Sequence, residues 1–347
     1  AINENNVCVI TGGPGTGKTT IIKTIIEIFK SNEMKPVLCA PTGRAAKKMT
    51  ETTGEEAKTL HRLLEIGKLS EDGQKINTNI SVAPIDGDIV IVDEMSMVDL
   101  FLMNYLCKAL YKGTKLVLVG DIDQLPSVGP GNVLKDIIES GRITTITLNK
   151  IFRQAARSKI IVNAHRVNEG MGFITKEEIS DSSLNDFFFV DEKNKDKILY
   201  NVITLSGERL KNYGDYDFFK NIQVITPTKK DELGTKELNK LLQQTVNPPA
   251  ESKKERKFGD SIFREGDRIM QIKNNYDIYW EKKEPYFESG SGVFNGEFGT
   301  IQIIDEFNKQ IKIKYDDEKE AWYQFSELEQ IEHAYAITVH KAQRKRV

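Results

Sequence analysis

The sequence has few cysteines and no long hydrophobic run, and these absences exclude several classes of protein. Its three cysteines, Cys8, Cys39 and Cys107, are far apart and show no C-x-x-C spacing. A disulfide framework and a zinc site are therefore not expected, and a reducing compartment fits best. No apolar run approaches the roughly 18 residues of a membrane-spanning helix, and the N-terminus has no signal-like basic region or cleavage site. We expect a cytoplasmic protein with no membrane partner.

The sequence also lacks a marked excess of either charge. Among its 347 residues, 49 Lys and Arg stand against 51 Asp and Glu, which gives a formal net charge of −2. This balance neither favours nor excludes a nucleic acid as partner, so any basic surface must be local. The length corresponds to about two domains, and such a chain buries a sizeable core without disulfides or metals.

The first 150 residues alternate short β-branched runs with helical patterns, which is typical of a parallel sheet covered by helices. Helical spacing covers residues 19–30 and 45–51. Residues 65–81 are polar and rich in turn residues, and they form either a small hairpin insertion or a loop. The predicted strands are nearly continuous apolar runs, as expected for strands buried on both faces; they span residues 7–10, 37–40, 89–92, 116–119 and 143–148.

From residue 151 onward the pattern changes. Residues 151–170 are predicted to be helical, and residues 187–190 and 222–226 to be strands. Residues 246–257 have no periodicity and are predicted to form a linker or an exposed loop.

A β-rich module follows in residues 258–328, where short strands alternate with turns, as in a small β-barrel. An apolar run at 335–339 then predicts a further buried strand, so the module is interpreted as an insertion into a second domain. The strands predicted within it are 268–271, 299–304, 311–315 and 322–325.

The most specific motif is a glycine-rich stretch between the first predicted strand and the first predicted helix. It matches G-x-x-x-x-G-K-[ST] in full, in the context in which such a loop binds phosphates. Glycines let backbone N–H groups surround phosphates, and the helix N-terminus adds a partial positive charge. We expect Lys18 to reach the β- and γ-phosphates and Thr19 to bind Mg²⁺. The predicted nucleotide-binding residues of this stretch are Gly12, Gly13, Pro14, Gly15, Thr16, Gly17, Lys18, Thr19 and Thr20.

Two adjacent carboxylates, Asp93 and Glu94, end the predicted strand at 89–92. Such a strand end delivers the first carboxylate to the metal side of a nucleotide site and the second to the place of an attacking water. Asp93 is therefore predicted to bind the nucleotide's Mg²⁺ together with Thr19, and Glu94 to act as general base. The alternative is an acidic strand end without a catalytic role.

A third polar segment, residues 120–126, follows the predicted strand at 116–119. The amide of Gln124 can donate and accept hydrogen bonds, so it can sense a γ-phosphate. Asp121 and Asp123 have two interpretations, a role in this site or a structural role in which one of them caps the loop or binds an arginine.

These three motifs, in this order and on successive predicted strands, resemble motifs I, II and III of superfamily 1 helicases. More narrowly, residues 40–46, 58–63 and 93–99 resemble the RecD-like branch, superfamily 1B, which includes exodeoxyribonuclease V alpha subunits. Residues 151–154 are similar to motif IV of that branch and residues 335–343 to the start of its motif V. The likeness covers nearly the whole chain.

The resemblance implies an α/β protein with two RecA-like P-loop NTPase domains and a small SH3-like β-barrel inserted in the second. Domain 1A then spans residues 1–150, domain 2A residues 151–257 and 329–347, and the 2B insertion residues 258–328. The family pattern continues beyond residue 343 with a segment and a motif VI that are not found here, so domain 2A is expected to be incomplete at its C-terminal end.

The resemblance also implies a function, that of an ATP hydrolase and DNA helicase. Such a protein uses ATP and Mg²⁺ to move 5′ to 3′ along single-stranded DNA and to unwind duplex, in DNA repair or recombination. Arg153 would reach the γ-phosphate as an arginine finger, or alternatively be a surface or capping residue. The expected partners are single-stranded DNA, junctions of single- and double-stranded DNA, and repair or recombination proteins, and the chain is expected to be a monomer. The implied catalytic residues are Lys18, Glu94, Gln124 and Arg153.

Single-stranded DNA is expected to contact both RecA-like domains. In the first, residues 42–44 lie between a strand and a helix, where backbone amides and a guanidinium can hold phosphates. The alternative for each lone Thr or His is an ordinary hydrogen-bonded polar group. The candidates, most of them by resemblance, are Thr42, Gly43, Arg44, Thr59, His61, Thr338 and His340.

The β-rich module carries several aromatic residues, and its segments 266–271 and 293–299 resemble the SH3-like 2B domain. The aromatic side chains either stack on bases of single-stranded DNA or pack the small barrel. They are Tyr276, Tyr279, Trp280, Tyr286, Phe287 and Phe294.

Two other functions compete with a DNA motor. One is an ATP-switched DNA-binding or scaffold subunit that does not unwind, and the other is a small-molecule P-loop kinase. The later motifs and the inserted barrel have no role in a kinase. Glu94 separates a switch from a motor, because a motor with Gln at this position binds ATP but stops turning over.

Overall fold

The computed structural model describes residues 2, 4–66, 82–150, 157–175, 186–214, 216–283 and 287–345. The chain forms two compact units, Ala1–Val190 and Asp191–Val347, and each is considered by itself. Residues 151–190, which the sequence assigns to domain 2A, lie within the first of these units. The assignment of domains 1A, 2A and 2B stays a prediction.

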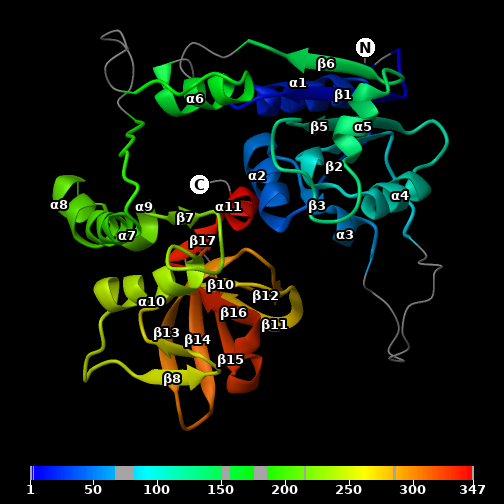
Figure 1. The fold of residues 1–347 in the computed structure, drawn as a ribbon. Coiled ribbons are helices and arrows are strands. Elements are labelled where there is room, and N and C mark those ends of the chain that lie inside the picture. The colour runs from blue at the N-terminus through cyan, green and yellow to red at the C-terminus, as the bar shows by residue number, and fades with distance from the viewer. Residues whose placement is uncertain are drawn as a thin grey trace. The chain divides into compact units, whose positions relative to one another are not determined.

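The first unit is built on a six-stranded sheet whose five strand pairings are all parallel. Strands far apart in the sequence lie side by side, since the last strand pairs with the first, Cys8 opposite Thr144 (Figure 1). All five strands predicted here are present, and only the three-residue β3 lacked a detectable pattern. The order across the sheet is β3 (Ala57–Thr59), β2 (Pro36–Ala40), β4 (Ile89–Val92), β5 (Lys115–Gly120), β1 (Val7–Gly12) and β6 (Thr144–Leu148).

Helices pack on both faces of this sheet because alternate strand residues point to opposite sides. In β4, Ile89 and Ile91 join the core with α1 (Lys18–Ser31) and α2 (Gly43–Thr53). Val90 and Val92 join the core on the other side, and each such buried aliphatic side chain contributes about 1.5–3 kcal/mol to folding. The helices in that second core are α3 (Leu60–Leu63), α4 (Leu100–Ala109) and α5 (Val133–Glu139).

All three cysteines are free thiols. Cys8 and Cys39 are buried in β1 and β2, and burial raises the pKa of the Cys39 thiol well above its usual value. Within the described residues, no helix has both the length and the apolar character needed to cross a membrane.

The first unit ends with α6 (Lys159–Asn168) and with an irregular segment, residues 186–190, which we call the strap. The Asp186 carboxylate accepts hydrogen bonds from the Ser158 hydroxyl (2.5 Å) and the Lys159 backbone N–H (2.8 Å) at the start of α6. Although desolvation opposes the shift, these hydrogen bonds lower the pKa of Asp186. The strap is irregular at residues 187–190, so the strand predicted there is wrong. Phe187 and Phe189 instead pack on the ring of Phe173.

In the second unit, helices surround a short parallel pair of strands, β7 (Val224–Thr226) and β17 (Ala336–Thr338). Tyr335, fully buried, packs here against Leu238 and Leu242. The strand predicted at 222–226 is confirmed, and the apolar run at 335–339 ends in a helix because α11 begins at Val339. The helices are α7 (Lys195–Thr204), the π-helical η4 (Leu205–Arg209), α8 (Leu210–Gly214), α9 (Phe218–Asn221), α10 (Thr235–Val246) and α11 (Val339–Lys345).

The remainder of the second unit is β-rich, with one hairpin and one seven-stranded antiparallel sheet whose inward residues form a single core. The hairpin joins β8 (Glu255–Phe258) to β9 (Ser261–Arg264). The predicted linker at 246–257 is therefore partly wrong, because its end forms a strand. The sheet order is β12 (Glu288–Val293), β11 (Asn275–Lys282), β15 (Glu320–Gln324), β14 (Gln310–Tyr315), β13 (Phe298–Asp305), β10 (Arg268–Gln271) and β16 (Ile331–His333), with the 3₁₀ helix η5 (Phe325–Gln330) before β16.

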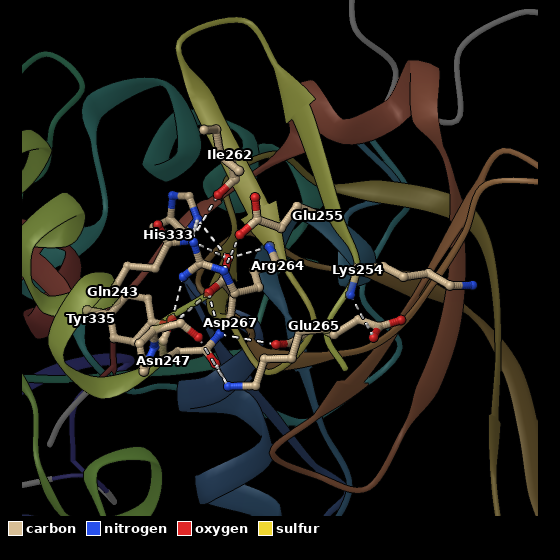
Figure 2. Close-up of polar contacts among 12 residues, drawn as sticks. Gln243, Asn247, Lys254, Glu255, Ile262, Arg264, Glu265, Asp267, His333 and Tyr335 are labelled. Atoms are coloured by element: carbon tan, nitrogen blue, oxygen red, sulfur yellow. Dashed lines mark hydrogen bonds and ion pairs between the residues drawn. The ribbon is translucent and has the colours of Figure 1, made fainter. Parts of the chain in front are cut away.

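A buried carboxylate, Asp267, joins the β-rich part to the helical part of this unit (Figure 2). It is 0% exposed and accepts hydrogen bonds from α10 and its C-cap, from the end of β9, from β16 and from the chain just after β16. A buried carboxylate is tolerated only when donors replace water in this way. The donors are Gln243 Nε2 (2.7 Å), Asn247 Nδ2 (2.8 Å), Arg264 N (2.7 Å), His333 Nε2 (3.1 Å) and Tyr335 Oη (2.8 Å).

Candidate nucleotide-binding site

The motifs found in the sequence follow three neighbouring strands at one edge of the first sheet. β5 lies between β1 and β4, with Gly120 opposite Thr11 and Leu118 opposite Val92. Because these strands are parallel, their carboxyl ends meet at one edge, where open α/β sheets bind ligands. Two strand spacings, about 10 Å, separate the end of β1 from that of β4.

The glycine-rich loop after β1 has the backbone that a phosphate cradle requires. Gly15 (φ 74°) and Gly17 (φ 85°) are in the left-handed region, which glycine adopts without strain. A side chain at Gly12 would lie 2.8 Å from Thr16 Oγ1 and 2.9 Å from Leu148 Cβ, so only glycine fits. Gly17 is the N-cap of α1 and offers no side chain to its first N–H groups, which favours an anion at this helix end.

Lys18 lies against the inside of this loop. Its ammonium donates to the carbonyl oxygens of Gly12 (2.5 Å) and Gly13 (3.0 Å). The Thr16 hydroxyl donates to the Gly13 carbonyl at 2.8 Å, which closes the turn. The lysine is therefore already within the curve of the loop, where phosphate oxygens would take the place of the carbonyls.

The carboxylate pair after β4 has an unusual backbone. Glu94 has φ 56° and ψ 42°, the left-handed conformation that is rare for a residue with a side chain. Its backbone N–H donates to Asp93 Oδ1 at 2.8 Å, and the Asp93 N–H donates to the Cys39 carbonyl of the neighbouring strand. The 3₁₀ helix η1 (Met95–Met97) begins directly afterwards. The chain thus turns sharply at the two adjacent carboxylates, whose separate roles stay predictions.

Asp121, after β5, is 2% exposed and caps its own loop. Its carboxylate accepts hydrogen bonds from the Asp123 backbone N–H (3.1 Å) and from Gln124 Nε2 (3.2 Å). Of the two interpretations for Asp121, the geometry supports loop capping. The same contact orients the Gln124 amide, whereas the Asp123 side chain is exposed.

A cavity of about 500 Å³ joins this loop to the glycine-rich loop and to α6, all within the first unit. Its polar wall contains Asp121, Asp123 and Gln124, and Pro14 contributes the phosphate-loop side. Its apolar wall comes from Ile160 and Val167 of α6, from Phe173 in the segment that follows α6, and from Phe187 of the strap. The glycine-rich loop and the loop after β5, two of the three motifs, therefore line the same cavity.

The sequence gave no indication that α6 touches the phosphate loop. His165 Nε2 lies 3.1 Å from the Pro14 carbonyl oxygen, and the imidazole lies directly over Gly13. The helical pattern at 151–170 predicted the element, but no local motif distinguishes His165 from an ordinary polar residue of an amphipathic helix.

The residues at this edge fit ATP and Mg²⁺. The glycine cradle, the lysine within it and the acidic strand end form the donor set of a P-loop site, in which Mg²⁺ is held by one or two protein oxygens and by phosphates. Two buried hydroxyls, Thr11 Oγ1 at the end of β1 and Ser96 Oγ in η1, have no hydrogen-bond partner among the described residues. Buried polar groups normally have partners, so both hydroxyls are suited to bind water or ligand oxygen at this edge. The individual roles of Lys18, Thr19, Thr20, Asp93, Glu94 and Gln124 stay predictions.

The DNA-binding candidates of the first unit lie together at the ends of β2 and β3, where Ala40 pairs with Thr59. Thr42 is the N-cap of α2 and accepts from Ala45 N, and Thr59 is the N-cap of α3 and accepts from Arg62 N. The N-termini of α2 and α3 thus lie side by side, with Gly43 next to the Thr59 methyl group. Both hydroxyls accept a capping hydrogen bond and keep their own O–H, so a phosphate there could receive hydrogen bonds from these hydroxyls and from backbone N–H groups.

His61 follows the second of these caps. Desolvation lowers the pKa of the His61 imidazole, and the Asp99 carboxylate opposes the shift. The ring is therefore neutral at pH 7 and would offer DNA a hydrogen bond instead of a charge. Arg44 lies in the first turn of α2, and its side chain is outside the described residues.

The other predicted contacts lie elsewhere. Thr338 is buried at the end of β17 opposite Thr226, and His340 is exposed in α11, both in the second unit. Arg153, the possible hairpin from residue 67 to 81 and Tyr286 lie outside the described residues. Their predicted roles stay predictions.

The structure divides the aromatic residues of the β-rich part into two groups. Trp280 packs on the barrel core and lies over Gly290, where a methyl group would meet its ring at 2.6 Å. Tyr276, Tyr279 and Phe287 are 53%, 56% and 67% exposed, so they do not pack the core. Packing thus explains Trp280, and base stacking stays open for the exposed rings.

Comparisons with known families agree with this architecture. Residues 1–130 match the AAA domain family, which covers the three motifs of the first unit. Residues 238–315 match the family described as the SH3 domain of ATP-dependent RecD-like DNA helicases.

Individual relatives extend the match to 98% of the chain. The ATP-dependent RecD2 DNA helicase of Deinococcus radiodurans is 32% identical over 339 residues, and the chain covers 42% of that protein. The RecBCD enzyme subunit RecD of Buchnera aphidicola is 28% identical over 402 residues, with 64% of that protein covered. Among solved structures, the Pif1 helicase of Candida albicans covers 97% of this chain and 82% of its own, with 17% identity and a TM-score of 0.45.

The predicted resemblance to the RecD-like DNA helicases is confirmed by these relatives and by the SH3 domain match. Of the predicted fold class, the α/β architecture with a parallel sheet and the SH3-like β module are confirmed as well, while the division into two RecA-like domains stays a prediction. The chain spans about two fifths to two thirds of the length of these two curated relatives.

Proposed function

We propose that this chain is the motor part of an ATP-dependent DNA helicase, which couples hydrolysis of Mg²⁺-bound ATP to 5′-to-3′ movement along single-stranded DNA. One observation carries the proposal. The phosphate loop and the Asp121–Gln124 loop line the same cavity in a chain that also carries a RecD-like SH3 domain. A metabolite kinase has no use for that second domain.

The chemistry follows from the predicted roles of the residues at the sheet edge. The loop amides and Lys18 hold the β- and γ-phosphates, and Glu94 takes a proton from the water whose oxygen attacks the γ-phosphorus while the bond to ADP breaks. Gln124, held by Asp121, contacts the γ-phosphate, and Arg153 neutralises charge that develops there. Mg²⁺ on Thr19 and Asp93 would neutralise the phosphates when bound.

For the DNA, we propose that the paired helix N-termini at Thr42–Gly43 and Thr59 hold one phosphate group of the strand, and that Thr338 and His340 hold another. If the distance between these two phosphate-binding sites changes between the ATP-bound and ADP-bound states, the strand moves in steps. The proposed substrates are single-stranded DNA and its junctions with duplex, in repair or recombination in the cytoplasm. RecBCD subunits among the relatives support this setting.

The direction of movement is tested by strand displacement. With ATP and Mg²⁺, we expect this chain to separate a duplex that carries a 5′ single-stranded tail and to leave duplexes with a 3′ tail or blunt ends intact. Gel separation of labelled strands measures this. Preferential unwinding of the 3′-tailed duplex would contradict the proposed direction. ATP-dependent DNA binding with no displaced strand from any of the three would instead favour a nucleotide-switched binding subunit.

A further inference from the structure

His165 lies against the outer surface of the phosphate loop. Its Nε2 atom is 3.1 Å from the carbonyl oxygen of Pro14. A carbonyl oxygen only accepts hydrogen bonds, so the imidazole carries a proton on Nε2 and donates it. The ring also covers Gly13, because a Cβ placed there would be 2.5 Å from His165 Cε1. The three atoms nearest to such a Cβ all belong to this ring.

The helix that carries His165 is braced by contacts of its neighbouring residues and of its first turn. Asn163, 4% exposed, exchanges two hydrogen bonds with the backbone of Ile174, at 2.6 Å and 3.0 Å. Arg166 Nε donates to the Gly172 carbonyl at 2.8 Å, and Asp186 caps the start of the helix. Such supports on both sides of position 165 hold the imidazole in one place.

The loop is thereby held from two sides. Lys18 binds the Gly12 and Gly13 carbonyls from within, and His165 binds the Pro14 carbonyl from outside. Neither contact uses the loop N–H groups, which are the groups that bind phosphate in such loops. Fixing the carbonyls fixes the peptide planes and therefore the direction of those N–H groups.

We infer that His165 is a positioning residue of the nucleotide site, which preorganises the Pro14–Gly15 peptide, and with it the Gly15 N–H, for phosphate binding. The inference rests on the proposed ATPase function and adds a residue outside the recognised motifs. It also explains why position 13, where no positive φ demands glycine, has no side chain.

Equilibrium titration of the full chain with a fluorescent ATP analogue tests the inference. We expect His165→Ala to weaken binding by about three- to tenfold, the usual effect of losing one such hydrogen bond. His165→Gln keeps an N–H donor near the Nε2 position, so it is expected to bind within about twofold of the unsubstituted chain. His165→Ala should also raise KM for ATP with kcat nearly unchanged, because His165 touches the loop and not the reacting atoms, and His165→Gln should restore KM.

A second variant separates this role from a general loss of folding. In Gly13→Ala the new methyl group displaces the imidazole, so binding should weaken as in His165→Ala. The double variant should bind like either single one, because the same contact is lost once. All variants should have the same midpoint of thermal unfolding, which would exclude a general loss of folding.

The outcomes distinguish two failures. Unchanged analogue binding in His165→Ala, or independent additive effects in the double variant, would overturn the inference while nucleotide binding stands. Absence of analogue binding by the unsubstituted chain would overturn the proposed ATPase function, and the positioning role with it.

Discussion

Glu94→Gln is expected to reduce ATP turnover by about 10²- to 10⁴-fold while the affinity for ATP stays nearly the same. The amide cannot accept the proton of the attacking water, yet it matches the carboxylate in size. Gln adopts the left-handed backbone of this position no less readily than Glu, so the turn at φ 56° should persist. Phosphate release under saturating ATP measures turnover, and a fluorescent analogue measures affinity.

The matched control is Glu139→Gln on α5. Glu139 is an exposed glutamate of the same unit that pairs only loosely with Lys135 (3.7 Å). Its substitution should leave both turnover and affinity within about twofold, as expected for an exposed pair of small net energy. Undiminished turnover in Glu94→Gln would remove this residue from the role of general base.

Asp267→Ala is expected to have the largest effect on stability, a loss of about 3–5 kcal/mol in the free energy of unfolding of the second unit. The change deletes the acceptor of five buried hydrogen bonds (Figure 2). The Gln243 and Asn247 amides keep a backbone carbonyl as second acceptor, whereas the Arg264 N–H and the Tyr335 hydroxyl lose this partner. Both tryptophans of the chain, Trp280 and Trp322, lie in the β-rich part. Their fluorescence during urea unfolding therefore reports this unit.

Asp260→Ala provides the comparison. Asp260 lies in the same unit but is highly exposed, and its pair with Lys236 (3.2 Å) is exposed too. This change should lower the free energy of unfolding by no more than about 0.5 kcal/mol. If the two alanine variants had the same urea midpoint of unfolding, the buried hydrogen bonds of Asp267 would not stabilise the packing of the β-rich part on the helices.

The sequence predicted best where buried strands and glycines impose strict patterns. The apolar runs before Gly12, Asp93 and Asp121 predicted β1, β4 and β5, and together with the motifs they predicted which polar residues share one edge of the sheet. Parallel strands of an α/β unit are buried on both faces, so their composition leaves little ambiguity.

Contacts between distant segments could not be predicted in the same way. Nothing local to His165 or Pro14 indicates that they meet, and Asp267 is an ordinary aspartate in a turn until five donors surround it. The strand predicted at 187–190 is wrong because three consecutive phenylalanines satisfy a strand pattern, while here two of them pack on Phe173. Tertiary packing decides such segments.

The central claim, that the edge of the first sheet is the ATP site of a DNA motor, is tested most directly by steady-state ATP hydrolysis with and without a single-stranded DNA oligonucleotide. The expected result is turnover that rises severalfold with DNA and that Glu94→Gln abolishes. A rate of ATP hydrolysis that does not rise with DNA, or that is unchanged in Glu94→Gln, would contradict the claim.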